Sequence, residues 1–543
     1  MTRVYEFPAP TENRHASSVS IAQAMTRQRL FLTGMSILMV LAMGTLPVLA
    51  AGSFDVRRFG ADGNGSTMDT AAIQKAIDAA AAAGGGTVVF PAGIFLSGSI
   101  HLKSHVTLRV EEGATLKGSP RRSDYRKLDF HGLILASGQE NIGICGKGVI
   151  DGNGKPLVAE TMRLLAEGKL RDSEPDNRPY ASVGERPVII NFNKCRNITV
   201  RDVTLRESAC WVQEYRECTR LLVENIKVRT MAAITNDGID IDSCSQVIVR
   251  GCDIDSEDDG ICLKSGPRVC EDVLVENCRV RSSCNALKFG TASTKGFKNI
   301  TCRNIEIHDT YLSGIALEIV DGGRMENVNI SKVRMTTTNN PLFIRLGHRN
   351  VKGAVGSIEG VTISDVTAEI PDRPRREMNK FPSHWRHQCT TLITGSITGL
   401  PGHPVRGVTL RNISITYGGI GGAPKPGHHR IDKLSLVPEC AANYPESKMF
   451  GVLPAWGLYL RHAEGITLDN VTLRVSGKDY RAALVCDDVR NLRMNRLNVL
   501  SAGSDPVLVF NDVRGAIIRN SVAPPRSVRF LESMGATTDV TGP

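Results

Sequence analysis

The sequence predicts an all-β fold, a single-stranded right-handed parallel β-helix with an N-terminal capping helix. First, short apolar runs recur every 22 to 29 residues, the length of one coil of such a helix. Second, each run is followed by a second one, such as NITVRDVTL or DVLVENCRV. Third, the chain carries 52 glycines, which suits many tight turns. The first runs start at Val188, Val212, Gly238, Gly260, Ala286, Ile315 and Phe343.

The N-terminal end of the coils is expected to carry a helix. Asp69 or Thr70 can begin it, its alanines favour helix as far as about Ala83, and three glycines from Gly84 mark its end. An open end of stacked sheets leaves an unpaired edge and an apolar interior, so we expect this helix to cover them. Strands are predicted after it at Thr87–Phe90, Gly93–Leu96 and Val106–Val110.

The chain divides into an N-terminal extension over residues 1–50 and one β-helix domain over residues 51–543. The domain carries loop insertions near residues 151–187, 371–402 and 418–456. Long loops on a regular scaffold often line a binding site, and a surface excursion is the alternative. Leu157–Leu170, within the first insertion, is compatible with a short helix.

The N-terminal extension has the order of a secretory signal peptide. Arg27 and Arg29 precede an apolar segment, about residues 30–49, and small residues follow from Ala50. We therefore expect a secreted or periplasmic protein without stable membrane insertion after signal removal. A retained anchor is the alternative, since the apolar segment is at the short limit of a membrane span. The true start is either Met1 or Met25.

Charge narrows the range of partners. The formal net charge is +10, and it is +8 without residues 1–50, which hold four basic and two acidic residues. A basic excess favours anionic partners, and a mixed surface is the plain alternative. No lysine-rich run with interleaved aromatics is present, so nucleic acid is not expected.

The chain has 14 cysteines, which an exported protein can pair as disulfides. No Cys-x-x-Cys spacing is present, so the pattern does not indicate a zinc site. The pairing cannot be assigned from the sequence, and small apolar core residues are the alternative role. Six of the cysteines fall within the repeats, at Cys244, Cys252, Cys262, Cys270, Cys278 and Cys284.

The polar positions of the apolar runs predict a strip on the outside of the coils. Because strand residues alternate between two faces, the apolar partners point inward and the polar ones outward. Such a strip suits a polysaccharide groove, and ordinary solvated surface is the alternative. Trp456 or Tyr459 could stack on a sugar or pack in the core. The strip consists of Asn191, Asp240, Lys264, Lys288, Glu318 and Arg345, with His348 and Arg349 just beyond.

Three acids are the predicted catalytic group. Asp237 precedes one strand, and Asp258 and Asp259 precede the strand of the next coil, so stacking should bring them together. Glycoside hydrolysis needs one carboxylic acid to protonate the leaving oxygen and one carboxylate to activate water. Neighbouring negative charges raise the pKa of one member, which can then hold a proton near neutrality.

The acid-rich stretch around Asp253 has two other interpretations. It could bind calcium, but an EF-hand loop requires Gly where Asp258 stands, and its closing Glu is missing. The acids could also cap turns, which is a sufficient role for Asp253 and Asp255. We therefore expect neither a metal nor a cofactor.

The segments DGID from Asp237 and DDGICLKSG from Asp258 resemble the motifs of glycoside hydrolase family 28, the polygalacturonase family. The N-terminal segments FGADGNG and GGGTVVFPAG are similar to motifs of pectin-degrading β-helix proteins. The resemblance implies an inverting hydrolase without metal that acts on a pectic, anionic polysaccharide. It implies that Asp258 is the general acid, and that Asp237 and Asp259 position and activate water. We expect a monomer.

The sequence also departs from the family pattern at the expected substrate contacts. Asn285 stands where the family has the histidine of Gly-His-Gly, and Ala316-Leu317-Glu318 replaces its Arg-x-Lys. Glu318 would repel a uronate there, so we expect rhamnogalacturonan or another modified pectic glycan rather than plain homogalacturonan. A rebuilt anion site is the alternative, with Lys288, Arg345, His348 and Arg349 as its candidates.

Two other functions remain open from the sequence. A polysaccharide lyase on the same fold would use a basic residue with calcium, and a non-catalytic glycan-binding β-helix would need only the groove. Hydrolysis explains the three acids, and the other two functions do not. Whether attack is endo or exo is not determined, although insertions that close one groove end would favour exo attack.

Overall fold

The structure is a computed structural model, and it describes residues 52–170, 185–371, 392–501, 505–522, 524, 527 and 529–542. The predicted signal segment lies outside these residues, as do parts of the first two predicted insertions. In the part of the chain that is described, no helix is both long and apolar enough to cross a membrane.

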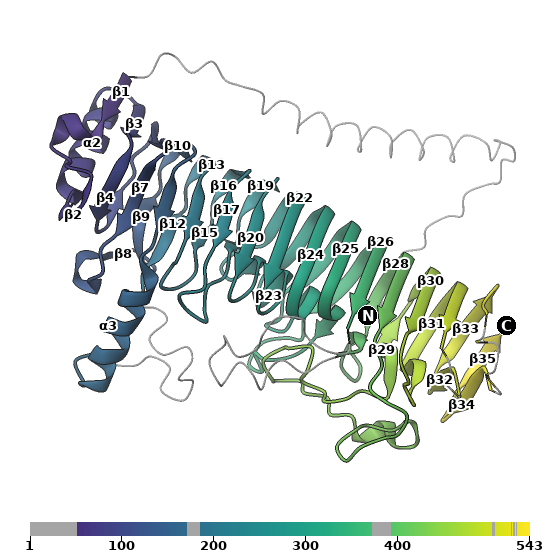
Figure 1. The fold of residues 1–543 in the computed structure, drawn as a ribbon. Helices are drawn as coiled ribbons and strands as arrows, with labels where there is room; N and C mark the ends of the chain where they lie inside the picture. Colours follow the sequence, from purple (N-terminus) through teal and green to yellow (C-terminus); the bar gives the residue numbers. More distant parts are fainter. Residues whose placement is uncertain are drawn as a thin grey trace, which may run out of the picture. The chain divides into compact units, whose positions relative to one another are not determined.

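The domain from Gly52 onward is a parallel β-helix, as predicted (Figure 1). One coil consists of β18 (Ile239–Asp242), β19 (Ser245–Arg250) and β20 (Asp253–Ser256), and the next begins with β21 (Ile261–Ser265). Each strand pairs in parallel with its equivalent one coil later, β18 with β21 for example. Every coil therefore repeats the same three positions, and residues far apart in sequence form columns along the axis.

The N-terminal cap is α2 (Thr70–Ala82), which confirms the predicted helix. Its buried face includes Ile73 and Ile77, and it packs on β1 (Gly52–Asp55) and β3 (Gly86–Phe90). Asp69 does not cap the helix with its side chain. Its carboxylate instead accepts hydrogen bonds from the backbone N–H groups of Asp62 and Gly63, at 2.8 and 3.1 Å.

The first strands and the short helix lie close to their predicted positions. The strands are β3, β4 (Gly93–Ser97) and β6 (Val106–Val110), the last with the predicted bounds. The helix of the first insertion, α3 (Gly154–Ala166), begins three residues before the predicted Leu157. Helix ends are set by local backbone geometry, which apolar periodicity does not reveal.

The coils enclose one continuous apolar core. Ile239 and Ile241 of β18 are fully buried there, and Ile261 and Leu263 of β21 are 1% exposed. Gly238 and Gly260 allow the turns before these strands to stack closely. A Cβ atom at Gly238 would lie 2.5 Å from the Gly260 carbonyl oxygen, so a larger residue would separate the coils. These two glycines thus fix the spacing of the acidic turns.

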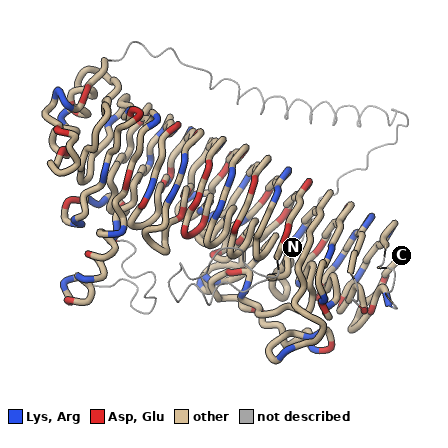
Figure 2. The backbone as a smooth tube through the Cα atoms, in the orientation of Figure 1, with Lys and Arg blue, Asp and Glu red and all other residues tan. Residues whose placement is uncertain are grey.

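The turns after the second strands carry stacked asparagines. Asn277 and Asn304 have positive φ angles, and Asn304 Nδ2 donates to Asn277 Oδ1 at 2.6 Å. Basic and acidic residues are interspersed along the coils (Figure 2). Many pair between neighbouring coils, for example Arg303 with Glu276 at 2.6 Å. The net positive charge is therefore spread over a mixed surface.

The described cysteines are all free, and most are buried. Several stack between coils: the Cys218 backbone N–H lies 3.3 Å from Cys244 Sγ, its hydrogen-bond acceptor. They serve as small core residues, the second of the two roles considered from the sequence.

The 418–456 insertion contains η6 (Ile431–Leu436). It packs on the outer face of the column formed by the first strand of each coil, the column to which β18 and β21 belong. Trp456 and Tyr459 are fully buried, so neither is available to a sugar. They belong to β29 (Ala455–Glu464), which enters the coil directly after the insertion. The outer apolar cluster consists of Ala316, Phe343, Leu434, Val437, Phe450, Leu453, Ala455, Tyr459, Ala482, Val485 and Val509.

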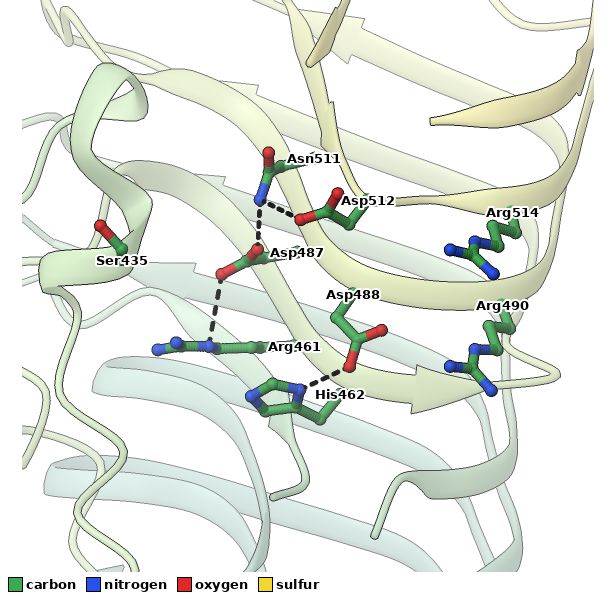
Figure 3. A pocket seen from close by; sticks show the side chains of 9 residues that line it. All are labelled: Ser435, Arg461, His462, Asp487, Asp488, Arg490, Asn511, Asp512 and Arg514. Carbon is green, nitrogen blue, oxygen red and sulfur yellow. Dashed lines mark hydrogen bonds and ion pairs between the residues drawn. The ribbon is translucent and has the colours of Figure 1, made fainter. Parts of the chain in front are cut away.

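Polar contacts fix the insertion as well. Glu439 Oε1 lies 2.6 Å from Arg461 Nη2 and 3.1 Å from His462 Nε2. His462 Nδ1 in turn lies 2.7 Å from Asp488 Oδ2 on the next coil (Figure 3). Burial lowers the pKa of His462, but its bonds to Glu439 and Asp488 raise it more, so the net shift is upward. Arg461, His462 and Asp488 line an open polar cavity of about 420 Å³, together with Ser435 of η6.

Candidate active site

The turns that carry the three predicted acids are hydrogen-bonded to each other. The Gly238 N–H donates to the Asp259 carbonyl at 2.8 Å, and the Asp258 N–H donates to the Asn236 carbonyl at 3.3 Å. Asp237, Asp258 and Asp259 are 4, 9 and 5% exposed. Stacking of adjacent coils thus brings the three carboxyl groups into one largely dehydrated cluster.

Asp258 has the environment of a proton donor. Burial raises its pKa most, and the charges of Asp237 and Asp259 raise it further, whereas Lys288 lowers it. The net pKa lies well above the ordinary value of an aspartate. Its Oδ1 accepts a hydrogen bond from the Asp259 N–H at 3.0 Å, which orients the group. A carboxyl of this kind can hold a proton near neutral pH.

Asp259 is surrounded by hydrogen-bond donors. Its Oδ1 accepts from the Asn285 backbone N–H at 3.1 Å and from Asn285 Nδ2 at 2.9 Å. Its Oδ2 lies 3.2 Å from Lys288 Nζ. Asn285, which stands where the family pattern has histidine, therefore orients an acid of the cluster.

Asp237 shares a lysine with Asp240. Lys264 Nζ lies 3.2 Å from Asp237 Oδ2 and 2.6 Å from Asp240 Oδ1. Burial and the charge of Asp240 nevertheless raise the pKa of Asp237 well above its ordinary value. Burial raises the pKa of Asp240 to about 7, with Lys264 opposing the shift.

Glu214 belongs to the same cluster, and the sequence analysis missed it. It is the register partner of Asp240 one coil earlier and is 4% exposed. Burial raises its pKa to about 7. The sequence does carry a signal for Glu214. It is the third residue of the run that starts at Val212, and Asp240 is the third residue of the next run.

The polar residues that the sequence places in one strip lie in two separate columns, so the predicted alignment of these residues is wrong. Asp240 pairs with Cys262, Cys262 with Lys288, and Lys288 with Ala316. Lys264 lies opposite Asp242, and Glu318 opposite Arg345, two residues further along the strands. The stacked Gly238 and Gly260 turns set this register, and register decides which side chains align.

The strip is also buried rather than solvated. Asp240 and Glu318 are fully buried, Lys288 is 2% exposed and Arg345 is 1% exposed. The 418–456 insertion packs against Ala316 and Phe343, the two column positions directly after Lys288, so solvent is excluded there.

The predicted cations beyond Lys288 contact protein groups. Arg345 donates to the carbonyls of Gly399, at 3.1 Å, and Glu439, at 2.5 Å. Arg349 forms a two-point ion pair with Asp321, with N···O distances of 2.9 and 2.7 Å. His348 contacts the Gly353 carbonyl through Nε2 at 3.0 Å. Arg345 thus connects the coil to the insertion, and the His348 backbone N–H does so as well, through the Ala441 carbonyl at 2.6 Å.

The insertion brings two residues to Lys288 that the sequence analysis did not select. Lys288 Nζ lies 5.3 Å from the centre of the Tyr444 ring, and Arg349 Cζ lies 5.8 Å from it. Burial raises the pKa of Glu446 to about 7, with the positive charge of Lys288 opposing the shift. No repeat pattern connects an insertion with a coil, so the sequence carried no signal for this contact.

Two groups of described side chains have donor atoms close enough to share a cation. These are Asp237, Asp240 and Cys262, and Asp258, Asp259 and Cys284, with donor atoms within 4.8 Å of one another in each group. A lysine ammonium already lies beside each group, Lys264 in the first and Lys288 in the second. A metal ion would have to displace these positive charges.

The chain is similar in sequence to known proteins of one family. Residues 83–425 match the family model described as glycosyl hydrolases family 28. The chain is 23% identical over 381 residues to an exo-poly-alpha-D-galacturonosidase of Dickeya chrysanthemi, a match that covers 58% of this chain and 63% of that protein. It is 25% identical over 388 residues to an endo-polygalacturonase of Pectobacterium carotovorum, covering 65% and 85% respectively.

A solved structure shares the fold. The hyperthermoactive exopolygalacturonase of Thermotoga maritima matches with a TM-score of 0.55 and 22% identity, over 69% of this chain and 88% of that one. At this identity the likeness concerns the coils and not the chemistry.

Proposed function

The chain belongs to family 28 of the glycosyl hydrolases, and we propose that it is a secreted enzyme that cleaves a pectin-type polysaccharide with inversion of configuration. The observation that carries this proposal is the buried Asp258, whose pKa is raised by burial and by Asp237 and Asp259. A proton donor and two further carboxyl groups in one cluster are the components that two-carboxylate hydrolysis requires.

In the proposed mechanism, Asp258 protonates the glycosidic oxygen as the bond to the anomeric carbon breaks. Asp237 and Asp259 position a water molecule on the opposite face of the sugar, and one of them accepts its proton. The oxygen of water forms the new bond, so the anomeric configuration inverts. Asn285 and Lys288 keep Asp259 oriented, and Lys264 does the same for Asp237.

The proposed substrate is rhamnogalacturonan or another modified pectic glycan, not plain homogalacturonan. This is supported by the cations of the described site, which already have partners: Lys264 with Asp240, Lys288 with Asp259 and Arg349 with Asp321. Glu214 and Asp240, each with a pKa raised to about 7, add partial negative charge beside the catalytic acids at neutral pH. A uronate carboxylate bound beside the catalytic acids would therefore gain little electrostatic attraction.

Ala316 supports the same substrate. It occupies the first position of the family's Arg-x-Lys and lies within the apolar cluster under the insertion. A guanidinium there would have to enter an apolar contact. The insertion thus gives a physical reason for the missing uronate clamp.

Export is a part of the proposal that rests on the sequence, and a monomeric state is proposed together with it. Arg27, Arg29 and the apolar segment that follows have the order of a signal peptide. The basic net charge suits retention on an acidic polysaccharide matrix. Fractionation of a tagged full-length chain, with mass determination of the exported form, tests both parts.

The test of function uses the purified mature chain with defined rhamnogalacturonan and homogalacturonan oligosaccharides. Hydrolysis of the first at a rate at least tenfold above the second is expected. Products that absorb ultraviolet light, together with loss of activity in chelator, would indicate a lyase instead. Equal rates on both substrates would refute the proposed preference.

A further inference from the structure

We propose that Trp211 and Tyr444 hold two sugar rings on opposite sides of Asp258, and that the 418–456 insertion ends the site at Tyr444. The enzyme would then release sugars from a chain end. This inference rests on the proposed function and specifies its subsites. Neither aromatic residue was among the residues predicted from the sequence.

Trp211 forms the wall on the N-terminal side of the acids. It precedes the strand one coil before Asp237, and the Val212 N–H donates to the Asp237 carbonyl at 2.9 Å. Its partly exposed ring packs edge-on against Phe130, with ring centres 4.8 Å apart. Lys264 Nζ lies 4.9 Å from the ring centre. The indole is therefore held in one orientation beside the ammonium that pairs with Asp237.

Tyr444 forms the wall on the other side. The residue is 55% exposed, although Lys288 and Arg349 approach its ring. Lys288 pairs with Asp259 as Lys264 pairs with Asp237. The order along the axis is thus Trp211, Asp237, Asp258 with Asp259, Lys288 and Tyr444. With coils about 4.8 Å apart, the Trp211 and Lys288 coils are separated by about 14 Å.

Aromatic rings at these positions suit sugars. The C–H groups of a pyranose face are apolar and slightly positive, so they pack on the negative face of an aromatic ring. Glu446, two residues after Tyr444, adds a polar contact: its Oε2 is buried and has no hydrogen-bond partner among the described residues. Such an oxygen can accept a hydrogen bond from a sugar hydroxyl at the Tyr444 side.

The insertion closes the site beyond Tyr444. Its apolar residues pack on Ala316 and Phe343, the next two positions in the column, and continue to Val485 and Val509. Arg345 and Arg461 add polar contacts to the same segment, through the Glu439 carbonyl and carboxylate. A polysaccharide cannot continue along this face, so the ring on Tyr444 belongs to a chain end.

The first test follows the products of the wild type on a rhamnogalacturonan polymer. Small products of one size should appear from the start while viscosity falls slowly. An early mixture of sizes with a rapid fall in viscosity would refute the closed end.

The second test measures binding of rhamnogalacturonan oligosaccharides by calorimetry in the Asp258→Asn background, which does not need turnover. Adding Tyr444→Ala or Trp211→Ala should weaken binding by about tenfold each. Tyr444→Phe and Trp211→Phe keep a ring and should stay within about twofold, and thermal unfolding confirms that each variant is folded. Unchanged binding in both alanine variants would overturn the inference.

Failure of this inference can be told apart from failure of the proposed function. If the wild type hydrolyses the polymer and Asp258→Asn does not, but both alanine variants behave as the wild type, the function stands and the subsites are wrong. If the folded wild type neither binds nor hydrolyses any pectic oligosaccharide, both proposals fail.

Discussion

Lys288 Nζ lies 3.2 Å from Asp259 Oδ2 in an ion pair whose side chains are 2% and 7% exposed. Glu318 and Glu446 also act on this ammonium, and together with Asp259 they keep the pKa of Lys288 well above its ordinary value despite burial. One cation thus balances three acids from two coils and the insertion. The same lysine thus stabilises buried acids of the fold and orients Asp259 of the proposed catalytic group.

Replacing Lys288 by Met should destabilise the protein by about 3 to 5 kcal/mol at pH 7, because it leaves buried acids without their partner. Burial keeps the pKa of Glu318 raised and that of Glu446 at about 7, so these acids take up protons as the pH falls. The loss should therefore be smaller at pH 5 than at pH 8. Urea unfolding at both values measures it.

Lys298→Met is the matched control, since Lys298 is 48% exposed and lies 3.8 Å from Glu326. It should change stability by less than about 0.5 kcal/mol at either pH. A pH-independent loss in Lys288→Met would contradict the account of its three acidic partners.

Replacing Glu318 by Gln should stabilise the protein at neutral pH, in contrast to the Lys288→Met variant. Glu318 is fully buried, and its carboxylate oxygens have no hydrogen-bond partner among the described residues. Burial raises the pKa of Glu318 well above its ordinary value of 4.5, so the wild type loses stability as the pH rises above 4.5 toward the pKa in the folded state. The glutamine variant lacks this loss. It should equal the wild type near pH 4 and exceed it at pH 7.5 in thermal unfolding, and equal stability at both values would contradict this.

Replacing Asp237 by Asn should move the alkaline limb of the residual activity to lower pH. The acid Asp258 must be protonated, so activity falls as the pH rises through its pKa. Burial and the charge of Asp237 both raise that pKa, and the variant removes the second cause. The measurement is kcat against pH at saturating substrate. A limb that stays in place or moves upward would show that Asp237 does not act on the acid.

Replacing Arg345 by Met should loosen the insertion. Arg345 donates to the Gly399 and Glu439 carbonyls and lies 5.3 Å from the Phe450 ring, so the variant loses the contacts that join the insertion, at Glu439 and Phe450, to the coil. Limited proteolysis between residues 431 and 453 should become at least tenfold faster. An unchanged cleavage rate combined with a raised KM would show direct substrate binding instead.

Much of the scaffold could be predicted because the coil repeat is local. The 22-residue interval from Gly238 to Gly260 fixes one coil, and alternation within each run identifies Ile239 and Ile241 as core residues. The same interval brings Asp237 beside Asp258 and Asp259, so the acid cluster followed from the repeat. Lys288 and Asn285 also contact this cluster.

The rest depends on contacts that no repeat encodes. The predicted strip aligns Lys264 with Asp240, and this register is wrong. Lys264 pairs with Asp242, two residues further along the strand, and only the stacked glycine turns show this pairing. Tyr444 reaches Lys288 from more than 150 residues away through the path of the insertion. The burial of Trp456 and Tyr459 likewise results from the return of the chain into the coil.

The most direct measurement compares Asp258→Asn with Asp255→Asn on rhamnogalacturonan oligosaccharides, with the product anomer followed by NMR. Asp255 lies three residues earlier and contacts Arg281 at 3.1 Å, so it is a matched acid outside the cluster. Asp258→Asn should lower kcat by about 100-fold to 10,000-fold, while Asp255→Asn and the wild type release the inverted anomer at similar rates. Retained activity in Asp258→Asn, or a product of retained configuration, would contradict the account.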